Sequence, residues 1–220
     1  MTIRHTLHAT ILSVALAFGC VALPDTVSAA PSSVPAPSFA MTGTDVLAGY
    51  ADWALDQWTI YWTTGSENAR VAFDATRNGI AAEAANRLGL DPAAMQAAWH
   101  AADIEHQIAL MAAFTQLGTR YRGYTATPGV GFDCSGLTSW AWAQAGVSMF
   151  HQSRTQINNS RAVTHETAQA GDIVYYPGHV MMYLGIDSAI IHAPFTGRNV
   201  ELSFVAKRRV NSARYGDPTG

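Results

Sequence analysis

The sequence predicts an α+β fold in which an all-helical segment precedes a helix that packs on an antiparallel sheet. Residues 44–115 are rich in alanine and methionine and carry the start and stop signals of helices. After Gly123 the pattern changes to short apolar runs separated by turn residues, which is typical of strands. The chain has 220 residues, 49% of them hydrophobic, which is enough for one sizeable core or for a small domain beside a larger one.

The first 29 residues have the pattern of a secretory signal peptide. A basic start that includes Arg4 precedes an apolar run from Ala9 to Leu23, and small residues follow up to Ala30. The run is short for a membrane span, so we expect cleavage after residue 29 or 30 and no stable membrane insertion of the mature chain. Secretion into the cell envelope, either periplasm or cell wall, would follow. An uncleaved anchor is the alternative, and Gly19-Cys20 leaves a lipoprotein site open.

A linker rich in proline and serine, residues 30–43, is predicted to lead into the helical region. We expect helices over residues 45–62 and 80–88, the second of which stops at a glycine. A further helix is expected over residues 91–117, because an Asp-Pro pair opens it and no breaker interrupts it. The first helix carries five aromatic residues, a spacing that indicates core packing more often than sugar stacking: Tyr50, Trp53, Trp58, Tyr61 and Trp62.

Residues 116–216 are predicted to form the mixed half of the fold. A helix is expected from Cys134 to Ala145, because Asp133 is a natural N-cap and Gly146 a stop signal. Apolar runs between turn signals predict four strands, over residues 172–176, 179–184, 189–192 and 200–205.

The charge balance excludes one class of partner. Lysines and arginines number 13 against 16 acidic residues, for a net charge of −3. A balance so near neutrality provides no general electrostatic attraction for phosphate backbones. We therefore expect no nucleic-acid partner.

Cys134 carries the clearest chemical signal. The chain has two cysteines, and Cys20 would leave with the signal peptide, so the mature chain would hold one thiol. In an oxidising compartment such a thiol is paired between chains, reactive, or a buried and inert small side chain. A predicted helix start favours the reactive interpretation, because unpaired N–H groups there can stabilise a thiolate and bind an oxyanion. We therefore expect a lowered thiol pKa, and close approach of another backbone or of a substrate at Gly136, which has no Cβ.

Two histidines lie in short apolar strands, whereas His151 and His165 are interpreted as surface residues. His179 opens one predicted strand and His192 closes the next. A connecting loop of two or four residues puts Pro194 opposite His179, so that His192 becomes its diagonal neighbour on the same sheet face. Such neighbours are about 7–8 Å apart at the backbone, within reach of two imidazoles. A loop with an odd number of residues would put the rings on opposite faces.

Together these residues predict a cysteine hydrolase. The thiolate of Cys134 would attack an amide carbon, His179 would serve as acid and base, and His192 would orient His179. We predict no metal and no cofactor, since one cysteine and two strand histidines do not supply the four ligands of a structural zinc site. His100 and His106 are six residues apart and share no helix face, so they do not form a metal pair.

Residues 117–205 resemble the NlpC/P60 family of cell-wall cysteine peptidases, whose architecture is related to that of papain. The resemblance rests on an ordered set of motifs: Leu117-Gly118-Thr119-Arg120-Tyr121, Gly131 through Leu137, Arg154-Thr155-Gln156, Ala170 through Val174, His179-Val180 with Tyr183-Leu184-Gly185, and Ile191-His192-Ala193-Pro194. An Asp-Cys-Ser-Gly motif alone would be weak, but the ordered set is specific. Two places depart from the family pattern: Gly123-Tyr124-Thr125, where an aromatic and two glycines are usual, and Met181-Met182, where Gly-Ile is usual.

The resemblance implies a papain-like domain that hydrolyses the peptide stems of peptidoglycan, commonly between D-glutamate and a diamino acid. It implies catalytic roles for Cys134 and His179 and an orienting role for His192. It also implies that three side chains line the substrate cleft: Tyr121, Asp133 and Ser135.

Two other functions stay open at this point. A papain-like amidase or acyltransferase would use the same triad on another substrate. A catalytically inactive cell-wall-binding protein would usually lack the cysteine or a histidine, and this chain retains both. A further hypothesis is that the helical region packs beside or over the cleft and restricts access to it.

Overall fold

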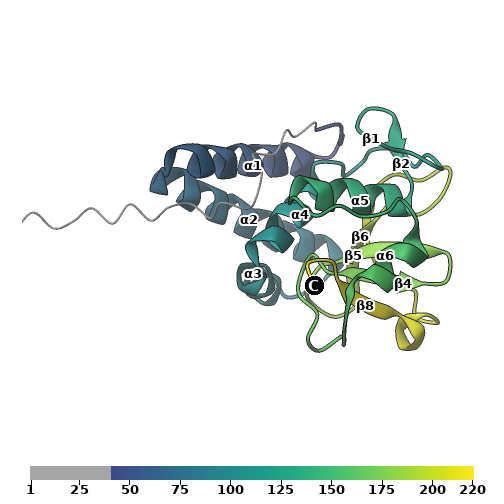
Figure 1. The fold of residues 1–220 in the computed structure, drawn as a ribbon. Helices are drawn as coiled ribbons and strands as arrows, with labels where there is room; N and C mark the ends of the chain where they lie inside the picture. Colours follow the sequence, from purple (N-terminus) through teal and green to yellow (C-terminus); the bar gives the residue numbers. More distant parts are fainter. Residues whose placement is uncertain (1–40) are drawn as a thin grey trace, which may run out of the picture.

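The computed structural model describes residues 41–220, in which a group of helices leads into a six-stranded sheet (Figure 1). The predicted signal peptide and nearly all of the predicted linker lie outside the described residues. No helix within residues 41–220 has both the length and the apolar character that crossing a membrane requires.

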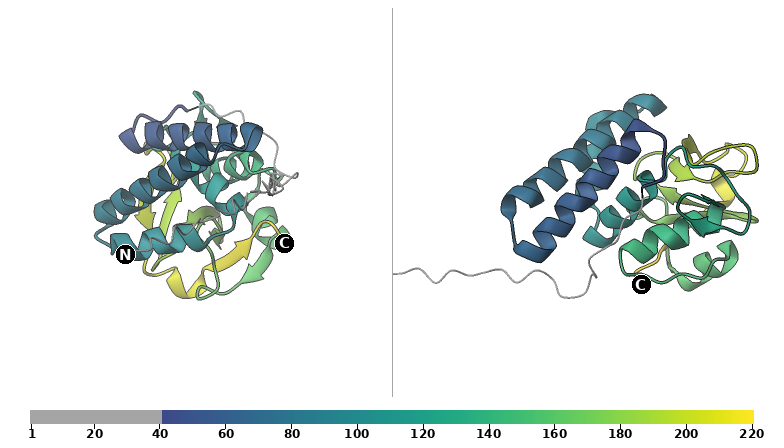
Figure 2. Two further views of the ribbon diagram at one scale, coloured as in Figure 1. Left: turned by 90° about the vertical axis from the view of Figure 1, so that its left-hand side faces the viewer. Right: turned by 90° about the horizontal axis from the view of Figure 1, so that it is seen from above.

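The helical segment consists of α1 (Val46–Thr64), α2 (Glu67–Leu88), α3 (Pro92–Ala101) and α4 (Ile104–Phe114). Asp45 caps α1 by accepting a hydrogen bond from the Leu47 N–H, and Gly65 ends that helix in the left-handed conformation. α1 and α2 then lie side by side as a hairpin that extends away from the sheet (Figure 2). Trp58 is buried against Phe73 of α2, whereas Tyr50 and Trp53 are exposed.

Two helix predictions are wrong in their bounds. α2 begins at Glu67 rather than at residue 80. The single helix predicted over 91–117 is divided, because Ala102 has an extended backbone. Two hydrogen bonds stabilise this break, one local and one tertiary: Gln107 Nε2 donates to the Ala102 carbonyl at 2.7 Å, and the Asp103 N–H donates to Gln169 Oε1 at 2.8 Å.

The sheet is antiparallel throughout, with the strand order β3-β8-β4-β5-β6-β7. Its strands are β3 (Arg161–Val163), β4 (Ile173–Tyr176), β5 (His179–Tyr183), β6 (Ala189–His192), β7 (Glu201–Phe204) and β8 (Arg214–Asp217). Four of them match the predicted strands, whereas β3, β8 and the small ribbon β1 (Ala126–Thr127) with β2 (Gly131–Phe132) were not predicted. α5 (Cys134–Gln144) packs against β5 and β6, and α6 (Ser153–Asn159), also not predicted, packs against β4.

The β5–β6 hairpin has the register that loop parity predicts. Met182 is paired with Ile191, and the Leu184 N–H donates to the Ala189 carbonyl at 2.9 Å. The loop therefore has four residues, 185–188, and the same register continued along the strands puts His179 opposite Pro194. The indole N–H of Trp99 in α3 donates to the Leu184 carbonyl at 2.9 Å, so the helical segment is bonded directly to the end of this hairpin.

One hydrophobic core extends through both halves of the fold. α4 lies at its centre, and its residues from His106 to Phe114 are all buried. α4 contacts α1 on one side and α5 on the other. The helical segment is thus packed against the helix that begins at Cys134.

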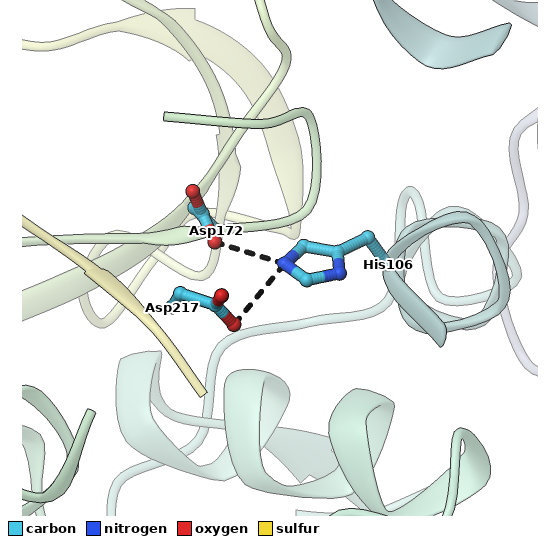
Figure 3. A group of neighbouring side chains, drawn as sticks. All are labelled: His106, Asp172 and Asp217. Atoms are coloured by element: carbon cyan, nitrogen blue, oxygen red, sulfur yellow. Dashed lines mark hydrogen bonds and ion pairs between the residues drawn. The ribbon is translucent and has the colours of Figure 1, made fainter. Parts of the chain in front are cut away.

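A buried ionic network ties α4 to the sheet (Figure 3). His106 points away from α4 toward two carboxylates, with its Nε2 3.0 Å from Asp172 Oδ1 and 3.4 Å from Asp217 Oδ1. Burial alone would raise the pKa of Asp217, but hydrogen bonds from Thr219 and the nearby His106 and Arg161 hold that pKa below its ordinary value. Two buried carboxylates this close together need a cationic or hydrogen-bonding partner, and His106 supplies it.

The replacement His106→Ala is expected to lower the free energy of unfolding by about 3–5 kcal/mol, because it leaves two buried carboxylates without their shared partner. Urea unfolding monitored by circular dichroism would measure the loss. The control Asn68→Ala removes an exposed polar side chain of α2 and should cost less than about 1 kcal/mol. Equal stabilities of the two variants would show that the network contributes nothing.

Candidate active site

The thiol of Cys134 lies at the first position of α5, as predicted. Asp133 is the N-cap: its Oδ1 accepts from the Gly136 N–H at 2.7 Å, and its carbonyl accepts from the Leu137 N–H at 2.9 Å. The N–H groups of Cys134 and Ser135 face the sulfur and act to lower its pKa. These two groups are the ones at the helix start that could receive an oxyanion.

Gly136 fits the helix start against the neighbouring loop. A Cβ at this position would lie 2.2 Å from the Thr125 carbonyl oxygen, which is too close for any side chain. The same oxygen accepts from the Asp133 N–H at 2.9 Å. The absence of a Cβ therefore allows the loop to bind the residue before the nucleophile, and the predicted close approach is confirmed.

The predicted lowering of the thiol pKa is wrong. Burial raises the pKa of Cys134 above its ordinary value, and the Asp133 carboxylate adds to that rise. The N–H groups of Val180, Ser135 and Cys134 itself oppose the rise without overcoming it. Desolvation of the thiolate thus outweighs the helix start, and the resting side chain is a neutral thiol.

His179 and His192 form a hydrogen-bonded pair of neutral rings. His179 Nε2 lies 2.8 Å from His192 Nδ1, and the two rings meet edge to face. Burial lowers the pKa of His179 to about 4. The pKa of His192 is lowered to about 3, first by burial and then by the neighbouring His179 and Arg198. The N–H of Val180, the residue after His179, interacts with the Cys134 sulfur, so the thiol lies at the start of β5.

The three residues expected to line the cleft come together around the thiol. Desolvation raises the pKa of Tyr121, and negative charge on Cys134 and Asp133 raises it further, so its hydroxyl lies on their side of the site. Ser135 Oγ donates to Asp133 Oδ1 at 3.1 Å. Asp133 is buried, and its Oδ1 also accepts the capping hydrogen bond from the Gly136 N–H.

Several neighbours of the site were missed from sequence. His151 is exposed as predicted, but its Nε2 lies 2.8 Å from Asp133 Oδ1. The buried Gln156 donates to the Ser135 carbonyl at 2.8 Å and so supports the first turn of α5. Tyr176 could have been found from the hairpin register, because it is paired with His179 across β4 and β5.

Within residues 41–220, one group of side chains has donor atoms close enough to bind a metal ion, namely His106, Asp172 and Asp217. Their oxygens already accept hydrogen bonds from the Gln169 N–H and from Thr219. These contacts account for the group as an ionic network, and we assign no metal chemistry to it.

The half of the chain that carries the site matches known proteins. Residues 118–216 match the NlpC/P60 family. A probable endopeptidase of Corynebacterium glutamicum is 38% identical over 142 residues, which are 63% of this chain and 59% of that protein. The gamma-D-glutamyl-L-lysine dipeptidyl-peptidase of Bacillus cereus is 36% identical over 87 residues, which are 36% of this chain and 26% of that protein.

A crystal structure of an NlpC/P60 family protein from Bacillus cereus superimposes with a TM-score of 0.46 at 28% identity, covering 51% of this chain and 39% of that one. The aligned part of the chain spans 59% of the length of the Corynebacterium glutamicum protein and 26% of that of the Bacillus cereus peptidase.

Replacing Gly136 by alanine is expected to lower the free energy of unfolding by about 2–3 kcal/mol, because the new Cβ would displace the Thr125 carbonyl. Thermal and urea unfolding would measure the effect. Gly79→Ala is the matched control, since Gly79 lies inside α2 with no atom within 4 Å of the added Cβ. It should stabilise the protein by about 0.5–1 kcal/mol. Similar effects of the two changes would contradict the packing argument.

Alkylation of Cys134 by iodoacetamide should be slower at pH 7 than alkylation of a free cysteine, and should accelerate steadily toward pH 10. The reason is the raised thiol pKa, which leaves little thiolate at neutral pH. Mass spectrometry can follow the reaction, because Cys134 is the one free cysteine of residues 41–220. Fast alkylation that does not change between pH 5 and pH 8 would instead indicate a preformed thiolate–imidazolium pair.

Proposed function

Because residues 118–216 match the NlpC/P60 family, we propose that this chain is a cysteine endopeptidase acting on the peptide stems of bacterial peptidoglycan. The observation that carries the proposal is the joint position of three side chains. Cys134 is the first residue of α5, and its sulfur interacts with the Val180 N–H. His179, the residue before Val180, shares a 2.8 Å hydrogen bond with His192. A nucleophile, a base and a group that orients the base are the parts that covalent amide hydrolysis needs.

The proposed reaction starts from uncharged groups. Cys134 transfers its proton to the free ring nitrogen of His179 as the sulfur attacks the amide carbon. The N–H groups of Cys134 and Ser135 stabilise the oxyanion. His179 then protonates the departing amine, and a water activated by the same ring hydrolyses the thioester. Since the pKa of His179 is about 4, the ring is uncharged at neutral pH and one of its nitrogens has a free lone pair.

We infer that the scissile bond joins D-glutamate to a diamino acid. The name of the Bacillus cereus relative, a gamma-D-glutamyl-L-lysine dipeptidyl-peptidase, supports a bond of this type. Stem peptides carry carboxylates, and two arginines lie near Tyr176, which is paired with His179. The charges of Arg208 and Arg209 lower the pKa of Tyr176, whereas that of Cys134 raises it. The Arg209 guanidinium lies 5.4 Å from the centre of the Tyr176 ring. In this proposal Tyr121, Asp133 and Ser135 contact the peptide.

The proposed place of action is the cell envelope, after removal of the predicted signal peptide. The N-terminal helices belong to the same proposal as a regulatory element. They contact the catalytic half in three places: α4 packs on α5, α2 packs beside β7, and the Trp99 indole donates a hydrogen bond to the Leu184 carbonyl at the end of β5. A shift of these helices would therefore act on the position of the nucleophile and of the histidine hairpin.

Digestion of purified peptidoglycan by the mature protein should create new amino termini at the diamino acid, read as fragment masses. Cys134→Ala should abolish them, with a loss of at least about 1,000-fold in rate, because no other group can form the thioester. Glu67→Gln, a surface change on α2, is the control and should keep full activity. Cleavage between sugar and peptide would indicate an amidase, and sedimentation with the wall without cleavage would indicate a binding protein. Either result would contradict the proposal.

A further inference from the structure

The outer ring nitrogen of His192 is buried and unpaired in the part of the chain that the structure describes. His192 Nδ1 faces His179, while His192 Nε2 is buried and has no hydrogen-bond partner among residues 41–220. Glu201 stands directly opposite His192 in the β6–β7 register, and its Oε1 lies 3.6 Å from that nitrogen. A buried N–H without an acceptor is costly, whereas a carboxylate at this distance needs only a small movement to accept it.

The hydrogen bond between the two rings allows two arrangements. Each neutral imidazole has one N–H and one bare nitrogen. In the first arrangement His179 Nε2–H donates to His192 Nδ1, so His179 Nδ1 is bare and His192 carries its proton on Nε2. In the second, His192 Nδ1–H donates to His179 Nε2, and the proton of His179 occupies Nδ1. Only the first arrangement leaves His179 able to accept the thiol proton.

The carboxylate distinguishes the two arrangements. In the first, the His192 Nε2–H points to an acceptor, Glu201. In the second, a bare nitrogen would face the same carboxylate, and two acceptors at 3.6 Å repel each other. We propose that Glu201 is a positioning residue that holds His192 in its Nε2–H tautomer and so keeps His179 ready to act as base. The inference rests on the proposed function of the triad.

Arg198 prepares Glu201 for this role. Its guanidinium binds both carboxylate oxygens, with Nη2 2.7 Å from Oε1 and 2.6 Å from Oε2. Such a two-pronged pair fixes the orientation of the carboxylate. The chain of contacts then runs from Arg198 through Glu201 and His192 to His179, beside the thiol.

The tautomer of His192 can be measured without any enzymatic reaction. Nitrogen-15 NMR of the Cys134→Ala protein distinguishes an Nε2–H ring from an Nδ1–H ring. We expect Nε2–H at His192 in this protein, and a mixture of tautomers once Glu201→Leu is added. Glu201→Gln should keep the Nε2–H form, because its amide oxygen accepts the same hydrogen bond.

The kinetics of stem-peptide cleavage give the second readout, with Cys134 intact. Glu201→Leu should lower kcat about ten-fold and leave KM nearly unchanged, since it affects the base and not substrate binding. Glu201→Gln should retain most of kcat. Glu67→Leu removes a carboxylate from another arginine pair, 2.7 Å from Arg70, and should change neither readout.

A proton on Nδ1 of His192 with Glu201 present would refute the inference. An unchanged tautomer of His192 in the Glu201→Leu protein would also refute it. This holds both if kcat is unaffected and if kcat falls equally in the leucine and glutamine variants. If the protein with Cys134 cleaves no wall peptide, the proposed function fails, and the tautomer measurement still decides whether Glu201 positions His192.

Discussion

The structure depends on the burial of α4 and on the ionic contact that fixes it. His106 reaches from this helix to Asp172, which precedes β4, and to Asp217 in β8, and its ring meets Trp142 of α5 edge to face. The His106 side chain thereby connects a helix of the N-terminal segment with the helix of the nucleophile and with two neighbouring strands. Gly171 allows α4 to lie this close to the start of β4, because a Cβ at residue 171 would lie 2.8 Å from the His106 carbonyl oxygen. The position of the thiol relative to the sheet follows from this arrangement.

The electrostatics of the site follow from burial more than from local dipoles. The thiol and both imidazoles are uncharged at rest, because each would lose hydration as an ion. Charge therefore develops only as the proton moves from sulfur to ring, next to N–H groups already in position. A site of this kind relies on preorganised dipoles and on the correct tautomer, and not on a standing ion pair.

Local signals were sufficient to predict the centre of the site. Asp133 as a cap and the parity of the β5–β6 loop predicted where Cys134 and the two histidines would lie, since both depend on neighbours in sequence. The missed features depend on distant residues. The break between α3 and α4 is stabilised by Gln169, and His106 finds Asp172 66 residues away. β3 and β8 are short, and a charged arginine begins each of them, so neither has the apolar alternation of a strand. The direction of the thiol pKa required knowledge of burial.

The continuous core has a consequence for how such a domain could be recombined during evolution. Residues 118–216 bury their helix α5 against α4, whose side chains Leu110, Met111 and Phe114 are fully enclosed. A gene fusion that moved the catalytic half alone would expose this apolar surface to water and release the helix that holds the nucleophile. In this chain the part that packs as one body is therefore longer than the part that carries the chemistry, because α4 covers the apolar side of α5.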